Sequence, residues 1–155
     1  MIYIAWRFGS RRHGISAVFA LFHDVLFILG MFAVFGRFLN VEVDIMFVTA
    51  TLTAVAFSVH DTIIIFDRIR EVRRQEPNMD FHEVVNRAFT STVVRSLNTS
   101  ISLILVLASL VLLGGDTIRW FVIALLIGTF VGAYSSPFVA TTLLTVWTDR
   151  TGENK

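Results

Sequence analysis

The chain has 155 residues, of which 55% are hydrophobic and only 16% are charged, and its mean hydropathy is +0.72. Soluble domains carry about 25% charged residues, spread along the chain, whereas here the charges are bunched and long tracts have almost none. With no Cys, this composition excludes a soluble globular enzyme, a disordered tail and a disulfide-stapled secreted module. A net charge of +1 offers no basic surface to nucleic acid. We therefore predict a small integral membrane protein.

Four stretches are long enough to cross a bilayer as helices, which takes about 20 apolar residues. They cover roughly 14–36, 45–66, 97–115 and 120–147. The preceding segment, 1–13, opens with MIYIAWRF, which is apolar but too short to span, and we expect it to hold the end of a preceding helix and a cytoplasmic link. The sequence thus predicts an all-α integral membrane protein, a bundle of four transmembrane helices plus the end of a preceding helix.

The basic residues divide unevenly between the two sides of these spans. Eleven lie before the first span, in the segment 67–95 or in the tail 148–155, and only Arg37 and Arg119 lie in the connections on the other side. The positive-inside rule places the eleven in the cytoplasm. With an even number of spans, both termini are expected there too.

The segment 67–95 is the only sizeable polar connection. Its first part is predicted to extend the second helix up to Pro77, and Asp80 and Glu83 then form a capping box. Apolar residues follow at helical spacing, namely Phe81, Val84, Val85, Ala88 and Phe89. We expect an amphipathic helix against the cytoplasmic membrane face that leads into the third span; the alternative is a solvated connector.

Two acids interrupt the predicted spans, each directly after a histidine. Asp24 follows His23 near the middle of the first span, and Asp61 follows His60 near the cytoplasmic end of the second. A charged side chain at a helix centre costs about 2.5–3.5 kcal/mol on insertion scales, and such residues face the bundle interior or a water-filled cavity. Function is therefore expected at these positions.

Asp61 continues a face of small residues that includes Ala54 and Ser58, which favours close contact with another helix. The third span opens with a matching polar stripe: Arg95, Asn98, Thr99 and Ser102. If these helices pack together, Asp61 can meet Arg95, and a carboxylate that alternates between pairing and desolvation changes its affinity for a proton. The alternatives are a static ion pair that fixes helix register, satisfied structural hydrogen bonds for Asp24 and His23, and contact with lipid or a neighbouring backbone carbonyl for His60.

The fourth span carries a packing motif. Gly128 and Gly132 form a G-x-x-x-G pattern that Ser136 continues, which predicts tight helix contact, and Pro137 predicts a kink. Catalytic patterns are missing, because there is no Cys nucleophile, no nucleotide-binding loop and too few His for a metal site. We predict no enzyme, no metal and no cofactor, so that energy would come from an ion gradient or a partner.

Four segments carry recognisable motifs: FSVHDTIIIFDRIRE at 57–71, RSLNTSISLILVLASLVLLGG from Arg95, GTFVGAYSSPFVATTLL from Gly128, and ALFHDV around Asp24. Together they resemble SecF, the smaller membrane subunit of the bacterial SecDF protein-export complex. SecD shares this helical module, but the motifs DRIRE (67–71) and NTS (98–100) favour SecF. Members normally begin with a further transmembrane helix and an extracytoplasmic domain, so the resemblance covers the C-terminal transmembrane part only.

This resemblance implies half of an RND-type machine that uses the proton gradient for late, ATP-independent preprotein movement across the inner membrane. The implied partners are a SecD-like subunit, a SecYEG-type channel, the preprotein and membrane lipids. The family's membrane acid and arginine correspond to Asp61 and Arg95, and its intramembrane HD acid corresponds to Asp24, while His60 stands where the family usually has Asn. Two other functions stay open, namely half of a proton-coupled small-molecule or lipid exporter and a non-catalytic assembly scaffold.

Overall fold

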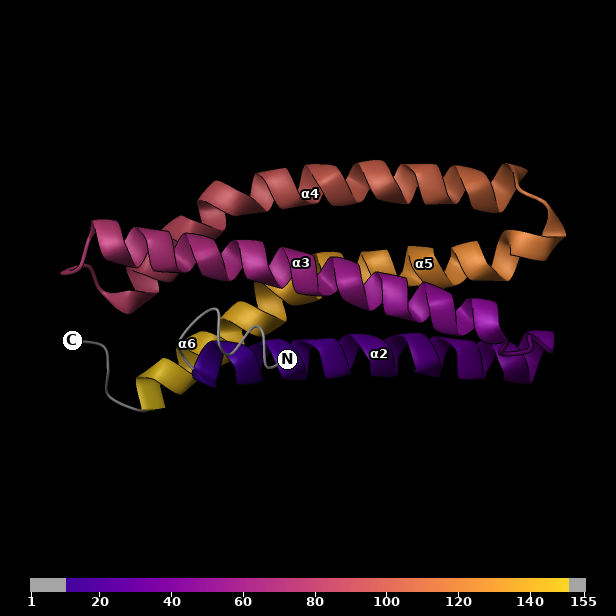
Figure 1. The fold of residues 1–155 in the computed structure, drawn as a ribbon, viewed down its shortest axis with the longest axis horizontal. Helices are drawn as coiled ribbons and strands as arrows, with labels where there is room; N and C mark the ends of the chain where they lie inside the picture. Colours follow the sequence, from indigo (N-terminus) through magenta and orange to yellow (C-terminus); the bar gives the residue numbers. More distant parts are fainter. Residues whose placement is uncertain (1–10, 151–155) are drawn as a thin grey trace.

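The computed structural model describes residues 11–150, which form helices joined by short connections. The helices are α2 (Arg11–Leu39), α3 (Ile45–Gln75), α4 (Phe81–Leu113), α5 (Asp116–Tyr134), the π-helical segment η1 (Ser135–Ala140) and α6 (Thr141–Arg150). Figure 1 shows α3 and α5 in the middle of the bundle, with α2 and α4 on opposite sides of them. The expected helix end in MIYIAWRF and the last five residues of the predicted tail lie outside the described residues.

Within the described residues, four helical stretches are long and apolar enough to cross a membrane. They are Gly14–Leu39, Ile45–Gln75, Phe81–Leu113 and Asp116–Trp147. The four predicted spans are therefore confirmed. The second and third helices run beyond the predicted limits, since the polar segment 67–95 is itself helical except for a short turn at 76–80.

Side-chain caps explain where α3 and α4 begin. The carboxylate of Asp44 accepts a hydrogen bond from the backbone N–H of Phe47 at 2.9 Å, and that of Asp80 accepts one from His82 at 3.0 Å. Each cap satisfies a backbone donor that has no partner within its own helix. Asp80 is thus the N-cap that the sequence predicts.

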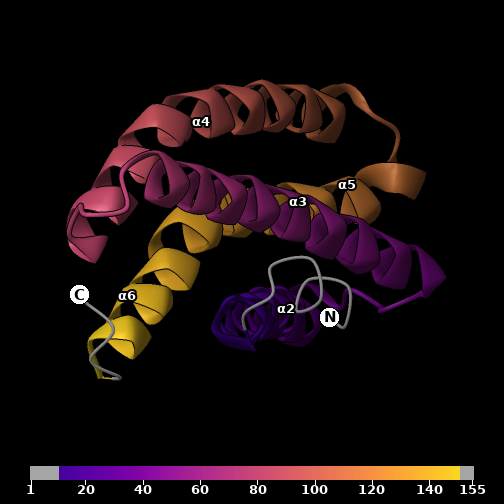
Figure 2. The ribbon, with the colours of Figure 1, turned by 60° about the vertical axis from the view of Figure 1, so that its left-hand side comes forward.

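The apolar face at the start of α4, which we expected against the membrane, packs on the end of α3. In Figure 2 the first turns of α4 fold back against the end of α3. An ion pair between Arg87 and Glu76 braces the turn between the two helices. The buried cluster joins Phe81, Val84, Val85 and Ala88 of α4 to Ile65, Phe66, Ile69 and Val72 of α3, with Ala17, Ala20 and Leu144. Because α3 extends past the predicted span, its last turns give α4 an apolar protein surface to pack on, in place of lipid headgroups.

The contact between α3 and α5 is made by small residues, as the G-x-x-x-G pattern predicts. A methyl group at Gly128 would overlap the Cβ of Ala54, and one at Gly132 would lie 3.3 Å from the Cβ of Ser58. One turn further on, the hydroxyl of Ser136 donates to the backbone carbonyl of Ser58 at 3.1 Å. The two backbones therefore approach as closely as side chains permit.

Pro137 lies inside η1, where the fourth span widens into a π-helix. Proline has no N–H and its ring crowds the carbonyl one turn earlier, and a π-helical turn accommodates both defects by changing the hydrogen-bond spacing. Figures 1 and 2 show α6 leaving at an angle to α5. The predicted kink is confirmed.

Substituting Gly128 by alanine tests the close contact. We expect Gly128→Ala to lower the free energy of unfolding by about 1–3 kcal/mol, as overpacking of a filled core does, and Gly132→Ala to cost less. Gly30→Ala is the matched control, because a methyl group there meets nothing within 4 Å. Denaturant titration in detergent measures all three, and equal stability of the Gly128 and Gly30 variants would contradict the packing.

Candidate functional site

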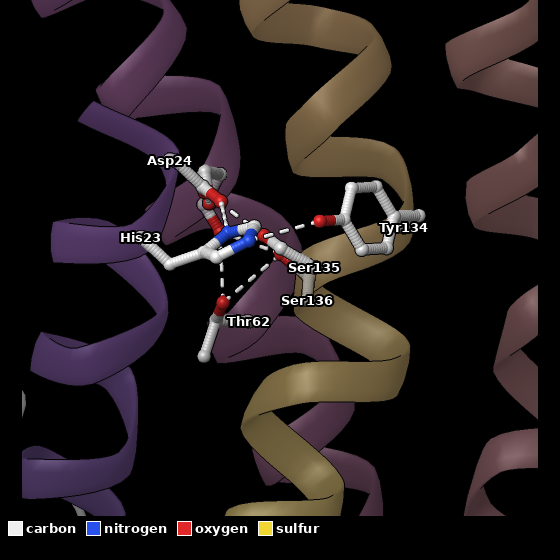
Figure 3. Close-up of polar contacts among 7 residues, drawn as sticks. His23, Asp24, Thr62, Tyr134, Ser135 and Ser136 are labelled. Carbon is white, nitrogen blue, oxygen red and sulfur yellow. Dashed lines mark hydrogen bonds and ion pairs between the residues drawn. The ribbon is translucent and has the colours of Figure 1, made fainter. Parts of the chain in front are cut away.

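Asp24 is almost fully buried, with 2% exposure, where α2 faces α3 and η1. One carboxylate oxygen accepts hydrogen bonds from the hydroxyls of Ser58 at 2.5 Å and Ser135 at 2.9 Å. The other lies 3.2 Å from Nδ1 of His23 (Figure 3). A buried carboxylate is costly unless it is hydrogen-bonded, and here three side chains from three elements meet that requirement.

The polar contacts continue on both sides of Asp24. Nε2 of His23 lies 3.0 Å from the hydroxyl of Tyr134. The hydroxyls of Thr62 and Ser136 lie 3.1 Å apart, and both reach the carbonyl of Ser58, at 2.9 and 3.1 Å. Figure 3 shows these groups converging between α2, α3 and the end of α5. Asp24 and His23 are thus brought together with Ser58, which the sequence predicts on the same helix face as Asp61.

Asp61 is half-buried and opens onto a different space. A cavity of about 190 Å³ lies between α3, α4 and α5, with polar lining from Ser58, His60, Asp61, Thr99, Ser100 and Thr129. The hydroxyl of Thr129 is buried with no partner among the described residues, and the hydroxyl of Ser96 interacts with the Asp61 carboxyl. Since a water molecule takes roughly 30 Å³ in the liquid, the cavity has room for several.

Arg95 is not brought into an ion pair with Asp61. It is exposed and lines a separate hollow with Asp67, Arg68 and Glu71. The whole predicted stripe of Arg95, Asn98, Thr99 and Ser102 is exposed on α4, although Thr99 also reaches the cavity. Ser96 and Ser100, one position around the helix from the predicted stripe, are the less exposed α4 residues on the Asp61 side.

The buried face of α3 also differs by one position from the predicted one. Ala54, Ser58 and Thr62 are each 2% exposed, so Thr62 continues the face and Asp61 lies at its edge. Sequence reasoning missed Thr62, Ser135 and Tyr134 as members of the polar network. The spacing from Ser58 to Thr62 was the available signal for the first, because a step of four residues keeps a side chain on the same helix face.

Comparison with known proteins identifies the family. Residues 1–150 match the family described as protein export membrane protein SecD/SecF, C-terminal. The chain belongs to the SecD/SecF family. It is similar to the protein translocase subunits SecF of Thermobaculum terrenum (47% identical over 152 residues, 96% of this chain and 48% of that protein) and Synechocystis sp. (43% over 147 residues, 95% and 46%).

A solved structure of the SecD/SecF family agrees with the fold. The crystal structure of SecDF in super-membrane-facing form matches with a TM-score of 0.88 and 35% identity, over 98% of this chain and 20% of that one. The predicted resemblance to SecF and the helical membrane fold are both confirmed. The chain spans about half the length of the curated SecF relatives that it matches.

Removing the Asp24 carboxylate tests its structural share in this SecD/SecF bundle. We expect Asp24→Ala to lower the free energy of unfolding by about 1–3 kcal/mol, because buried hydroxyls lose their acceptor. Asp116→Ala is the control, since that carboxylate is 87% exposed and pairs with the exposed Arg119. Unfolding in detergent measures both variants, and indistinguishable stabilities would show that the network contributes nothing.

Proposed function

We propose that this chain is a membrane subunit of the Sec protein-export machinery, which uses the proton motive force to drive late, ATP-independent preprotein translocation across the inner membrane. Family membership supports the Sec assignment. The half-buried carboxylate of Asp61 beside a polar cavity within the spans carries the proton-driven part. The chain works as a transport subunit with no covalent chemistry of its own, and a proton gradient takes the place of a cofactor.

Asp61 has the surroundings that proton coupling needs. Its carboxyl is reached from the cavity, where the described lining residues offer hydroxyls, His60 and apolar side chains. When it takes up a proton, the charge in the span disappears and the local helix contacts change. Arg95 lines the neighbouring hollow on the cytoplasmic side of the Asp61 cavity. A shift of α4 against α3 would bring Arg95 and Asp61 together in one state and separate them in another. Protonation would bias that choice.

The exposed polar stripe of α4 indicates that another protein covers this face in the membrane. Arg95, Asn98, Thr99 and Ser102 are exposed along a helix that is otherwise apolar enough to span the membrane, and polar groups facing lipid are costly. A SecD-like subunit that covers this face would remove the cost and complete the proton path. A SecYEG-type channel and the preprotein are the further partners, membrane lipids cover the apolar surface, and the positive-inside rule puts both termini in the cytoplasm.

Replacing Asp61 by asparagine tests proton coupling. In inverted vesicles holding the chain with its partners and depleted of ATP, we expect Asp61→Asn to abolish gradient-driven preprotein movement, since the amide cannot take up the proton. Asp116→Asn is the control, because it removes an exposed acid at the other end of the bundle.

The same experiment separates the competing functions. Unchanged gradient-driven export in Asp61→Asn would contradict the proposal. A loss of export that follows the amount of assembled complex would indicate a scaffold. Accumulation of small molecules or lipids without a secretion defect would indicate an exporter.

Cysteine cross-linking tests the partner surface, and the chain has no Cys of its own. We expect Ser102→Cys on α4 to cross-link to a SecD-like subunit carrying single cysteines in its spans. Phe19→Cys is the control, because Phe19 is 58% exposed but lies on α2, on the opposite side of the bundle. Equal cross-linking from both positions would refute the assignment of the α4 face.

A further inference from the structure

Ser58 belongs to both acidic sites. Its hydroxyl donates to Asp24 at 2.5 Å, and the same residue lines the cavity onto which Asp61 opens. Asp24 and Asp61 therefore lie on opposite sides of the α3–α5 contact, and Ser58 stands between them. A hydroxyl can accept one proton while it donates another, so Ser58 is placed to pass a proton between Asp24 and the Asp61 cavity.

On its other side Asp24 leads outward through His23 and Tyr134. The imidazole uses both nitrogens, Nδ1 on the carboxylate at 3.2 Å and Nε2 on the phenol at 3.0 Å. The two rings meet edge-on, 5.8 Å apart and at 87°. Both side chains are partly exposed, with Tyr134 at 38% and the His23 side chain at 38%. Holding Asp24 in place needs only the two serines, whereas an imidazole and a phenol left half-exposed in a span are costly.

We propose that Tyr134 and His23 form a proton-transfer branch that loads Asp24, and that Ser58 links this branch to the Asp61 cavity. The proposal rests on the proposed proton-driven function and adds a second entry route to it. An acid, an imidazole and a hydroxyl in line are suited to moving a proton, because each nitrogen of the ring can bind or release one.

The transfer balances as a shift along three hydrogen bonds. At the start Asp24 is a carboxylate, His23 carries its proton on Nδ1, and Tyr134 donates to Nε2. A hydronium ion at the exposed phenol gives its proton to the Tyr134 oxygen, as that oxygen passes its own proton to Nε2. The imidazole then releases the Nδ1 proton to Asp24. The branch ends with a neutral carboxylic acid, His23 protonated on Nε2, an intact phenol and one water.

The surroundings of Asp24 favour exchange over a fixed ion pair. Among the described residues, the titratable group of α2 that contacts Asp24 is His23, and Tyr134 at the end of α5 contacts His23 in turn. From α3 Asp24 meets Ser58, beyond which lie His60 and Asp61, and from η1 it meets Ser135. Within the described residues no Lys or Arg contacts its carboxylate. Protonation also weakens the bonds from Ser58 and Ser135, which tie η1 to α2 and α3.

Histidine NMR and infrared spectroscopy on the full chain, assembled with its SecD-like partner, test the branch. With only this chain ¹⁵N-histidine-labelled, four histidines report. We expect acidification to move the His23 proton from Nδ1 to Nε2 together with the appearance of a carboxylic-acid band that Asp24→Asn removes and Asp61→Asn retains. After a pH jump, Tyr134→Phe should slow the appearance of that band on the order of tenfold, since a positioned proton-transfer group accelerates transfer by at least that factor.

Phe27→Leu is the matched control, because it changes the ring packed near His23, 6.4 Å away, and keeps the phenol; it should leave the rate unchanged. If Asp24→Asn does not assemble with the partner, Ser58→Ala assigns the band instead. This variant removes a hydrogen bond to Asp24 and should therefore shift the frequency of the Asp24 band. An Asp24 band that ignores pH, or one that appears equally fast in Tyr134→Phe, overturns the proposal. If Asp24 loads normally while Asp61→Asn still exports, the proposed function fails and the branch stands. If Asp61→Asn stops export while Asp24 never titrates, the reverse holds.

Discussion

The close approach of α3 and α5 is the contact on which both acidic sites depend. In a membrane, apolar surface gives helices little reason to associate, so packing and polar contacts must hold them together. Gly128 and Gly132 leave room for Ala54 and Ser58 to touch the facing helix. That approach lets Ser58 of α3 and Ser135, which directly follows α5, donate to the same carboxylate oxygen of Asp24, and the Asp61 cavity lies on the other side of the contact. A wider separation of α3 and α5 would pull one of these two donors away from the buried carboxylate.

Properties that depend on one residue or one segment could be predicted from the sequence. The length of the apolar stretches gave the four spans, Asp80 gave a helix start, and Pro137 gave a kink, because each effect is set by local backbone chemistry. The G-x-x-x-G pattern could be interpreted for a similar reason, since a missing side chain has the same consequence against any partner helix. The burial of Asp24 followed from the cost of a charge within a span.

Features that depend on the rotation of one helix against another could not be predicted. α4 is apolar on nearly every side within the span, so periodicity does not determine whether Ser96 and Ser100 or Arg95 and Thr99 face α3. The start of α4 has a clear apolar face, which could be buried equally well against protein or against a membrane surface. It packs on protein because α3 is long enough to lie beside it. The π-helical turn is the third case. It changes the register of the fourth span, so that Ser135 and Ser136 are both fully buried and both bond to the network, which the ordinary helical period does not allow for.

Among the described residues, hydroxyls and imidazoles rather than arginines lie at the two acids, and this has a mechanical consequence. A guanidinium would stabilise a carboxylate through charge-assisted bonds about twice as strong as neutral ones, and removing its partner would leave an uncompensated charge in the bundle. Hydroxyls can reverse their direction of donation, so Ser58 and Ser135 remain satisfied whether Asp24 is charged or neutral. The proposed proton transfer to Asp24 would therefore leave the bundle intact. What changes is the strength of the ties between η1 and its neighbours, at the point where Pro137 has already weakened the helix. If Asp24 takes up protons as we propose, each one would loosen or tighten the bend of the fourth span through its bond to Ser135.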